Sequence, residues 1–243
     1  MAKPRFEQVN RIRFLTTIDF PPFNYLDDNG RLTGFHVDLA NAICGELGLL
    51  DRCQIQAIPW RELETALQTG AGDAVLAGIA VTAQKRDKFL FTRPYMRFPA
   101  RFVTPNGGEL SEPVHLSVAG RRIGVMAGTA HEAMLRDYFP AARPVTYSRA
   151  EWMYAAMRDG DLDGIFGDGL QLSYWLGSSA SANCCSFSGG PYVSDHYLGR
   201  GLSIAVAGDN QVLVDAFDFA LRDLQARGIY AELYLRYFPV SFF

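Results

Sequence analysis

The sequence lacks any long hydrophobic run, and it is poor in cysteine and histidine. Of its 243 residues, four are cysteine and four are histidine, while 49% are hydrophobic and 20% are charged. No apolar run approaches the roughly 18 residues that a membrane-spanning helix needs, and the first residues lack the hydrophobic segment of a signal peptide. The net charge of −3 provides no broad attraction to nucleic acid or acidic membranes. This composition predicts a soluble globular protein.

Motifs for metal binding, phosphate binding and nucleophilic catalysis are also lacking. The cysteines do not form the two separated pairs that a zinc site usually requires. The histidines are scattered at positions typical of a surface or a helix, namely His36, His115, His131 and His196. We therefore expect no metal, no cofactor, no nucleic-acid partner and no catalytic residues.

The spacing of the cysteines leaves their state open. Cys44 lies near the end of a predicted helix and Cys53 at the start of the next predicted strand. A disulfide between them, which would imply an oxidising compartment, and a pair of buried free thiols fit this placement about equally well. Cys184 and Cys185 are adjacent in a loop rich in Ser, Asn and Gly, and the sequence assigns them no role.

The order of predicted elements indicates two α/β units. Strand-like segments at residues 12–16, 53–58 and 74–77 alternate with helical patterns, and Phe35, Leu39, Ile43 and Leu47 form one such apolar stripe. A similar strand–helix alternation follows residue 105. This order predicts parallel sheets flanked by helices, with a cleft between two lobes. Ligands of such sheets bind at the carboxyl ends of the strands.

Residues 73–92 contain a candidate anion site. The predicted strand ends at Gly78, and Thr82 is placed to cap a short helical turn that carries Lys85 and Arg86. A strand end, a glycine and a cation beside free backbone N–H groups can bind an anion. An ordinary strand-to-helix connection with a solvated charge cluster explains the same residues equally well.

Four segments along the chain resemble the bacterial extracellular solute-binding proteins of family 3, the periplasmic receptors of polar amino-acid ABC transporters. Together they span nearly the whole chain in the order that the family shows. They are Phe20-Pro-Pro-Phe-Asn-Tyr25 with Gly34-Phe-His-Val-Asp-Leu-Ala40; Trp60 with Leu67-Gln-Thr-Gly70 and Asp73-Ala74; Ala77-Gly-Ile-Ala-Val-Thr82 with Phe91-Thr-Arg-Pro-Tyr95; and Ile123-Gly-Val-Met-Ala-Gly-Thr129 with Gly160-Asp-Leu-Asp163, Gly167-Asp168, Gly228-Ile-Tyr230 and Tyr237-Phe238.

The resemblance implies a two-lobed type II periplasmic-binding-protein fold, in which each lobe is a mostly parallel sheet flanked by helices. Residues 1–101 and 202–243 would form the first lobe and residues 102–201 the second, with hinges near residues 102–104 and 199–202. The lobes would close on a small ligand, and the monomeric receptor would deliver it to an ABC transporter permease. The family often carries a disulfide near Cys44 and Cys53, which favours the bonded state and a periplasmic location, with a signal peptide that this sequence does not include.

The resemblance also implies part of a binding site around residues 77–86. Lys85 occupies the position of the arginine that binds the ligand carboxylate in relatives, and Arg86 would replace it only if the turn shifted by one residue. Lysine neutralises an anion but cannot form the two-pronged contact of a guanidinium group. Ala77 and Gly78 belong to the same segment, and Ala80 stands where relatives usually have Ser or Thr.

Further ligand contacts are implied elsewhere in the chain. Thr129 would begin the helix that completes the carboxylate site, and Asp168 would pair with the ligand ammonium. Phe20 and Trp60 would enclose the ligand side chain. Thr17 stands where receptors for basic amino acids tend to have Asp, which predicts a neutral or aromatic ligand rather than a basic one.

Two other functions use the same fold. The chain could be the ligand-sensing domain of a membrane receptor, or an enzyme similar to cyclohexadienyl dehydratases. Such an enzyme requires a general acid, and Asp168 is the one obvious candidate in the implied cleft. The transport receptor remains the favoured interpretation.

Overall fold

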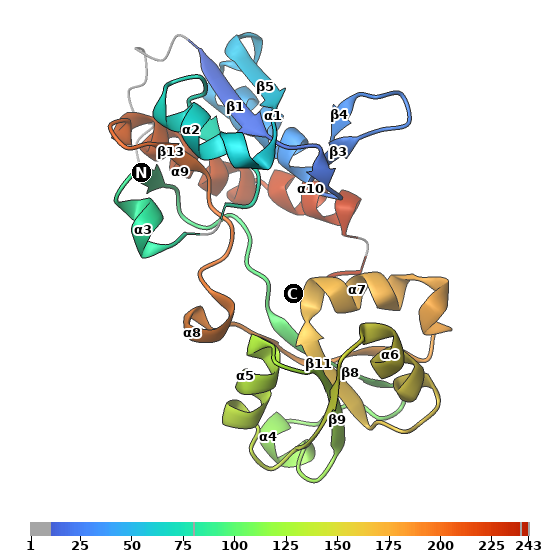
Figure 1. Ribbon diagram of the computed structural model, residues 1–243. Coiled ribbons are helices and arrows are strands. Elements are labelled where there is room, and N and C mark those ends of the chain that lie inside the picture. The colour runs from blue at the N-terminus through green and yellow to red at the C-terminus, as the bar shows by residue number, and fades with distance from the viewer. Residues whose placement is uncertain (1–10, 80, 239, 243) are drawn as a thin grey trace. The chain divides into compact units, whose positions relative to one another are not determined.

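The computed structural model describes residues 11–79, 81–238 and 240–242 and shows the predicted α/β class (Figure 1). The chain divides into two compact units. Of the described residues, unit 1 combines 11–79 and 81–96 with Gly201–Tyr237, and unit 2 combines Arg97–Arg200 with Phe238 and residues 240–242. Among the described residues, no helix is both long and apolar enough to cross a membrane.

Phe238 and residues 240–242 group with unit 2, which differs from the expected assignment of residues 202–243 to the first lobe. The reason is packing of aromatic rings. The Phe242 ring lies 6.3 Å from that of Phe98 and 5.4 Å from that of Phe238, measured between centroids. The other boundaries of the expected lobes stay a prediction.

Unit 1 contains a five-stranded sheet in the order β5–β1–β6–β13–β7. Strand β1 runs parallel to β5 and β6, whereas β13 runs antiparallel to β6 and β7. The sheet is therefore mixed rather than mostly parallel, because β13 enters it on the second passage of the chain through this unit. The strands are β1 (Ile12–Thr16), β5 (Cys53–Ala57), β6 (Ala74–Val75), β7 (Phe89–Phe91) and β13 (Ala205–Ala207).

Helices and a small second sheet complete unit 1. The helix α1 (Phe35–Leu47) buries its predicted stripe and ends at Gly48, whose φ of 71° favours glycine. It packs on α9 (Gln211–Ala226) and α10 (Ile229–Tyr237). The other elements are β2 (Asp19–Phe20), β3 (Asn24–Leu26), β4 (Leu32–Thr33), α2 (Leu63–Gln68), α3 (Ala83–Arg86) and the 3-10 turns η1 (Leu50–Arg52) and η2 (Trp60–Glu62).

Unit 2 repeats the mixed plan, with strands in the order β10–β9–β11–β8–β12. Strand β9 runs parallel to β10 and β11, and β8 runs antiparallel to β11 and β12. The strands are β8 (Ala100–Pro105), β9 (Arg122–Met126), β10 (Arg143–Tyr147), β11 (Gly164–Asp168) and β12 (Cys185–Tyr192).

Helices pack around the five-stranded sheet of unit 2 (Figure 1). They include α4 (Val114–Ser117), α5 (Ala130–Tyr138), α6 (Ala150–Arg158), α7 (Gly169–Gly177), η3 (Ser179–Ser181) and α8 (Asp195–Leu198). The core of the unit includes the rings of Phe102, Phe139, Phe166 and Tyr192, whose edge-to-face contacts suit aromatic packing.

All four cysteines are oxidised. Cys44 of α1 is bonded to Cys53 of β5, which confirms the pairing that the family resemblance favoured. Cys184 and Cys185, to which the sequence assigned no role, form a disulfide between adjacent residues whose Cα atoms lie 3.7 Å apart. The first bond joins two elements of unit 1, whereas the second encloses no chain segment.

A chain of hydrogen bonds is buried inside unit 1. His36 lies on α1 with 1% of its surface exposed, and its Nδ1 and Nε2 atoms lie 2.7 Å from Asn24 Oδ1 and 2.8 Å from the Tyr95 hydroxyl. Asn24 in turn donates to the Thr17 hydroxyl at 2.6 Å. Burial lowers the pKa of His36 to about 3, so the ring is neutral near pH 7.

The two disulfides predict different effects on stability. Replacing Cys44 and Cys53 together by serine is expected to lower the free energy of unfolding by about 2–3 kcal/mol, because the bond closes a loop in the unfolded chain. The matched control replaces Cys184 and Cys185, whose bond closes no such loop, and should cost less. Denaturant unfolding measures both values, and equal losses would contradict this account.

The burial of His36 predicts a dependence of stability on pH. The folded chain holds the pKa of His36 near 3, whereas the unfolded chain binds a proton there at about pH 6.5. The unfolded state therefore gains protons first as the pH falls below about 6.5, and the free energy of unfolding should decrease by up to about 1.4 kcal/mol per pH unit. In His36→Asn this contribution disappears, so the stability difference between wild type and variant should shrink on acidification. A difference that stays constant down to about pH 4.5 would refute the assignment.

Candidate functional site

A pocket in unit 1 lies where the parallel strands end. Two adjoining cavities of about 280 and 200 Å³ share Thr17, Asp19 and Trp60 in their walls. Thr17 follows β1 and Trp60 follows β5, while Ala77 and Gly78 follow β6. The carboxyl ends of parallel strands are the usual place for a ligand in such a sheet. The structure thus brings together four of the residues expected in the site: Phe20, Trp60, Ala77 and Gly78.

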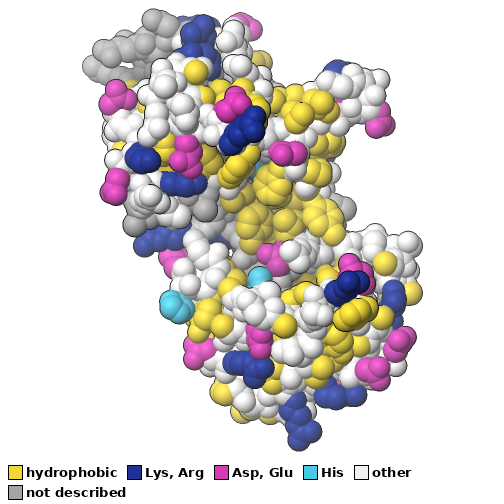
Figure 2. Space-filling view, in the orientation of Figure 1, with side chains coloured by type: hydrophobic (Ala, Val, Ile, Leu, Met, Phe, Trp, Pro, Cys, Tyr) yellow, Lys and Arg dark blue, Asp and Glu magenta, His cyan; other side chains and the backbone are white. Residues whose placement is uncertain are grey.

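The pocket wall is largely aromatic. Phe20 is 38% exposed and Trp60 is 51% exposed, and Figure 2 shows hydrophobic side chains gathered on the surface of unit 1. The Phe20 ring stacks on Phe23, with 4.7 Å between centroids and 20° between planes. Because exposed rings of this size are costly to hydrate, they are well suited to cover a ligand.

Gly78 is required by the position of Phe20. Its φ of 81° lies in the region that favours glycine, and a Cβ atom added there would lie 3.0 Å from Phe20 Cε1. The backbone of residues 77–78 can therefore approach the aromatic ring closely. A side chain at this position would be strained by the positive φ, and its Cβ atom would require the Phe20 ring to shift.

A carboxylate in the pocket was not anticipated from the sequence. Asp19 lies on β2, two residues after Thr17, and lines both cavities with its side chain exposed. The expectation of a ligand without a cationic side chain rested on Thr17 alone. The signal that could have found Asp19 is its position between Thr17 and Phe20 at the end of a buried strand.

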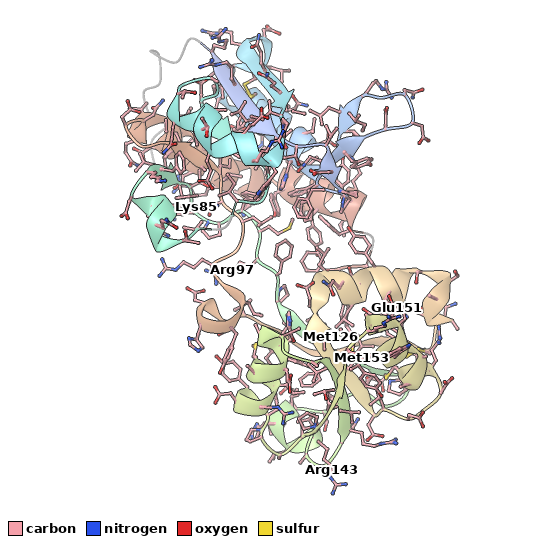
Figure 3. The ribbon with its side chains drawn as sticks, in the orientation of Figure 1. Lys85, Arg97, Met126, Arg143, Glu151 and Met153 are labelled. Atoms are coloured by element: carbon pink, nitrogen blue, oxygen red, sulfur yellow. A yellow bond between two sulfur atoms is a disulfide. The ribbon has the colours of Figure 1, made fainter. Side chains whose placement is uncertain are left out.

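The helix α3 carries the predicted cations, but Lys85 has a carboxylate partner within unit 1. Its Nζ atom lies 2.8 Å from Glu64 Oε1 of α2, and Figure 3 shows Lys85 at α3. Thr82 caps the helix as predicted, since its hydroxyl accepts from the Lys85 N–H at 3.3 Å. Arg86 is exposed, and Ala80 lies outside the described residues.

Thr129 in unit 2 caps α5 as expected from its place in the chain. Its hydroxyl donates to the Met126 carbonyl at 2.8 Å and accepts from the Glu132 N–H at 3.2 Å. Met126, labelled in Figure 3, ends β9. The Glu132 carboxylate accepts from the Gly128 N–H at 2.8 Å, and this bond lowers the pKa of Glu132. A carboxylate of the chain therefore already occupies one N–H group at this helix end.

Asp168 is the last residue of β11 and the cap of α7. Its Oδ1 atom accepts from the Gln171 N–H at 2.9 Å, which accounts for one carboxylate oxygen. The side chain is partly buried. Its role in binding stays a prediction.

A histidine and a tyrosine lie close enough to Asp168 to interact with its charge. Burial lowers the pKa of His131 while Asp168 acts in the opposite direction, and burial with the Asp168 charge raises the pKa of Tyr154. The His131 Nε2 atom is buried and has no hydrogen-bond partner in the described part of the chain. His131 belongs to the first turn of α5, which agrees with the helix position expected for it, and it lies near enough to Asp168 to interact with its charge.

Sequence comparison identifies the family. The profile of the bacterial extracellular solute-binding proteins, family 3, matches residues 12–240. The chain belongs to this family. The recognised resemblance and the type II periplasmic-binding-protein fold that it implied are thus confirmed.

The proteins that resemble this chain are named for different ligands or activities. The ABC transporter arginine-binding protein 1 of Escherichia coli K12 is 28% identical over 230 residues, which cover 94% of this chain and 91% of that protein. The histidine-binding periplasmic protein of the same organism is 26% identical over 230 residues, or 93% and 87% of the two chains. The crystal structure of an ancestral cyclohexadienyl dehydratase has a TM-score of 0.80 at 20% identity, covering 98% of each chain, and shows the shared fold alone.

The ion pair between Lys85 and Glu64 predicts how variants of this protein bind an amino acid. If Lys85 attracts the ligand carboxylate, Glu64→Gln should strengthen the binding of an amino acid by about 2–5-fold, because it removes a competing negative charge. Lys85→Gln should weaken it, and the double variant should match Lys85→Gln alone. Isothermal titration measures the four affinities, with Glu62→Gln as the control for loss of a nearby exposed charge. Equal affinities in wild type and Lys85→Gln would remove Lys85 from the site.

Proposed function

We propose that this protein is the periplasmic receptor of an ABC transporter, which captures an amino acid and delivers it to the permease. The observation that carries the proposal is the pocket of unit 1, in which two exposed aromatic rings, a carboxylate and a hydroxyl surround the strand ends. A mostly apolar pocket with a few polar groups is typical of a small-molecule site. Membership of a solute-binding family supplies the transport role.

The proposed ligand contacts combine both units. The side chain of the amino acid would lie between Phe20 and Trp60. Its ammonium group would pair with Asp168, whose second oxygen remains for a ligand after Oδ1 has capped α7. Closure of the lobes by a hinge motion would bring the two sets of contacts onto one ligand.

The carboxylate of the ligand would bind to the backbone around Gly78 and to the start of α5 at Thr129. The cation would be Lys85, shared with Glu64, since an ammonium group has three N–H donors. Arg86 is the alternative cation. Ala77 and Ala80 would contribute backbone rather than side-chain contacts.

The chemistry of the ligand side chain follows from Asp19. Thr17 in place of an Asp left no carboxylate for a side chain with N–H groups at its end. The Asp19 carboxylate lines the same pocket and can accept from such groups. Arginine and histidine, the amino acids for which two of the relatives are named, have such side chains. We therefore propose a polar amino acid whose terminal N–H group faces Asp19.

We propose no catalytic role for the site. The similarity to a dehydratase at 20% identity concerns the fold and carries no argument about reaction chemistry. Asp168 would bind the ligand ammonium rather than transfer a proton. Formation of an aromatic product from prephenate or arogenate would contradict this.

A panel of amino acids tests the proposal. A true ligand at about 100 times its dissociation constant should stabilise the protein by roughly 2.7 kcal/mol, which raises Tm by about 5–10 °C. Asp168→Asn keeps the cap of α7 but loses the charge, and should weaken every ligand by about 10–100-fold. The control is Asp161→Asn, the same change at an exposed residue in the turn before β11. If both variants bind equally well, Asp168 does not contact the ligand.

A further inference from the structure

The buried hydrogen-bond chain of unit 1 ends at the pocket. Tyr95, His36, Asn24 and Thr17 form it in that order, with heavy-atom distances of 2.8, 2.7 and 2.6 Å. All four are buried, with at most 3% of their surface exposed. The last member, Thr17, lines both cavities beside Asp19. The direction of these hydrogen bonds therefore decides whether the Thr17 hydroxyl can donate its hydrogen into the pocket.

The hydrogen bonds can run in either of two directions from donor to acceptor, because a neutral imidazole has one N–H donor and one acceptor. In the first, the Tyr95 hydroxyl donates to His36 Nε2, His36 Nδ1–H donates to Asn24 Oδ1, and the Asn24 amide donates to Thr17. In the second, every bond is reversed and the side-chain amide is turned over. The two directions differ in which hydroxyl hydrogen is left at the end of the chain.

Burial decides between the two directions. In the second direction, the hydrogen of the buried Tyr95 hydroxyl would lose its acceptor, since His36 is the partner of that hydroxyl in the described part of the chain. In the first, the remaining hydrogen belongs to Thr17 at the wall of the pocket, where a ligand can accept it. An unsatisfied buried hydroxyl is costly, whereas one facing a ligand is not. Burial also lowers the pKa of His36, which keeps the ring neutral, with one N–H donor and one acceptor.

We propose that His36, through Asn24, positions Thr17 as a hydrogen-bond donor to the ligand side chain. Asp19 accepts an N–H group in the same pocket, so the side chain that fits both carries an N–H donor and an acceptor atom. Carboxamide, ureido and neutral imidazole groups meet this condition, and their planar shape suits the space between Phe20 and Trp60. A guanidinium group has five donors and no acceptor, so it leaves Thr17 unsatisfied. This inference rests on the proposed function and names the class of amino acid that the receptor takes.

The first experiment measures selectivity by isothermal titration at about pH 8 with L-glutamine, L-citrulline, L-histidine and L-arginine. At least one of the first three should bind wild type more tightly than L-arginine. Thr17→Val keeps the shape but removes the donor, and should weaken that ligand by about 3–10-fold while changing L-arginine by less than about 2-fold. Thr17→Ser keeps the hydroxyl and should retain the preference.

The second experiment separates positioning by His36 from a purely structural role. His36→Leu removes both links of the ring and should reduce the preference over L-arginine, whereas His36→Asn retains an N–H donor toward Asn24 and should restore part of it. NMR of protein with 15N-labelled histidine reports the tautomer directly, also where His36→Leu does not fold. A proton on Nδ1 is expected, and a proton on Nε2 would overturn the proposal.

The outcomes distinguish this inference from the proposed function. If L-arginine binds most tightly and Thr17→Val weakens all ligands equally, the receptor function holds and the role of Thr17 is wrong. If no amino acid binds wild type, both proposals fail. A preference for glutamine, citrulline or histidine that Thr17→Val abolishes supports both.

Discussion

The pocket of unit 1 depends on the burial of a neutral histidine whose two ring nitrogens are both hydrogen-bonded. His36 connects Asn24 of β3 with Tyr95, which lies near the point where the chain leaves unit 1. A buried polar chain is stable only when each link is satisfied, because an orphaned donor or acceptor retains its full desolvation cost. The positions of α1, β3 and the segment around Tyr95 are therefore coupled to the pocket wall at Thr17.

Close packing adds a second constraint to the same pocket. Phe20 stacks on Phe23 and lies against Gly78, whose missing side chain lets the ring and the backbone approach each other. Phe23 in turn lies 4.9 Å from the His36 ring, between centroids. The aromatic wall and the polar chain thus share neighbours, so a change in one is expected to affect the other.

Unit 2 uses its candidate binding residues in its own architecture. Thr129 and Asp168 both cap helices, and the Glu132 carboxylate occupies a backbone N–H group beside Thr129. Helix capping places Thr129 just after β9 and Asp168 at the end of β11. Asp168 also lies near His131 and Tyr154. The same contacts that stabilise the helix ends also orient the two side chains that are proposed to bind the ligand.

Local patterns in the sequence were sufficient for the elements and the family. The apolar stripe from Phe35 to Leu47 predicted α1, the run after Asp73 predicted a buried strand, and the motif around Thr82 predicted its capping role. These features depend on residues within a few positions of one another, so periodicity and turn chemistry reveal them. The family followed from short motifs in a fixed order along the chain.

The tertiary structure decided which polar groups meet. Asp19 enters the pocket because β2 turns it toward Trp60, which lies about forty positions later in the chain. His36 contacts Tyr95, His131 lies near Asp168, and Lys85 pairs with Glu64, all across separations that no local pattern encodes. The sequence by itself therefore determined the fold class, the family and the strand ends where a ligand would bind. The charges and hydrogen-bond directions at that place depend on distances between remote side chains, which only folding sets.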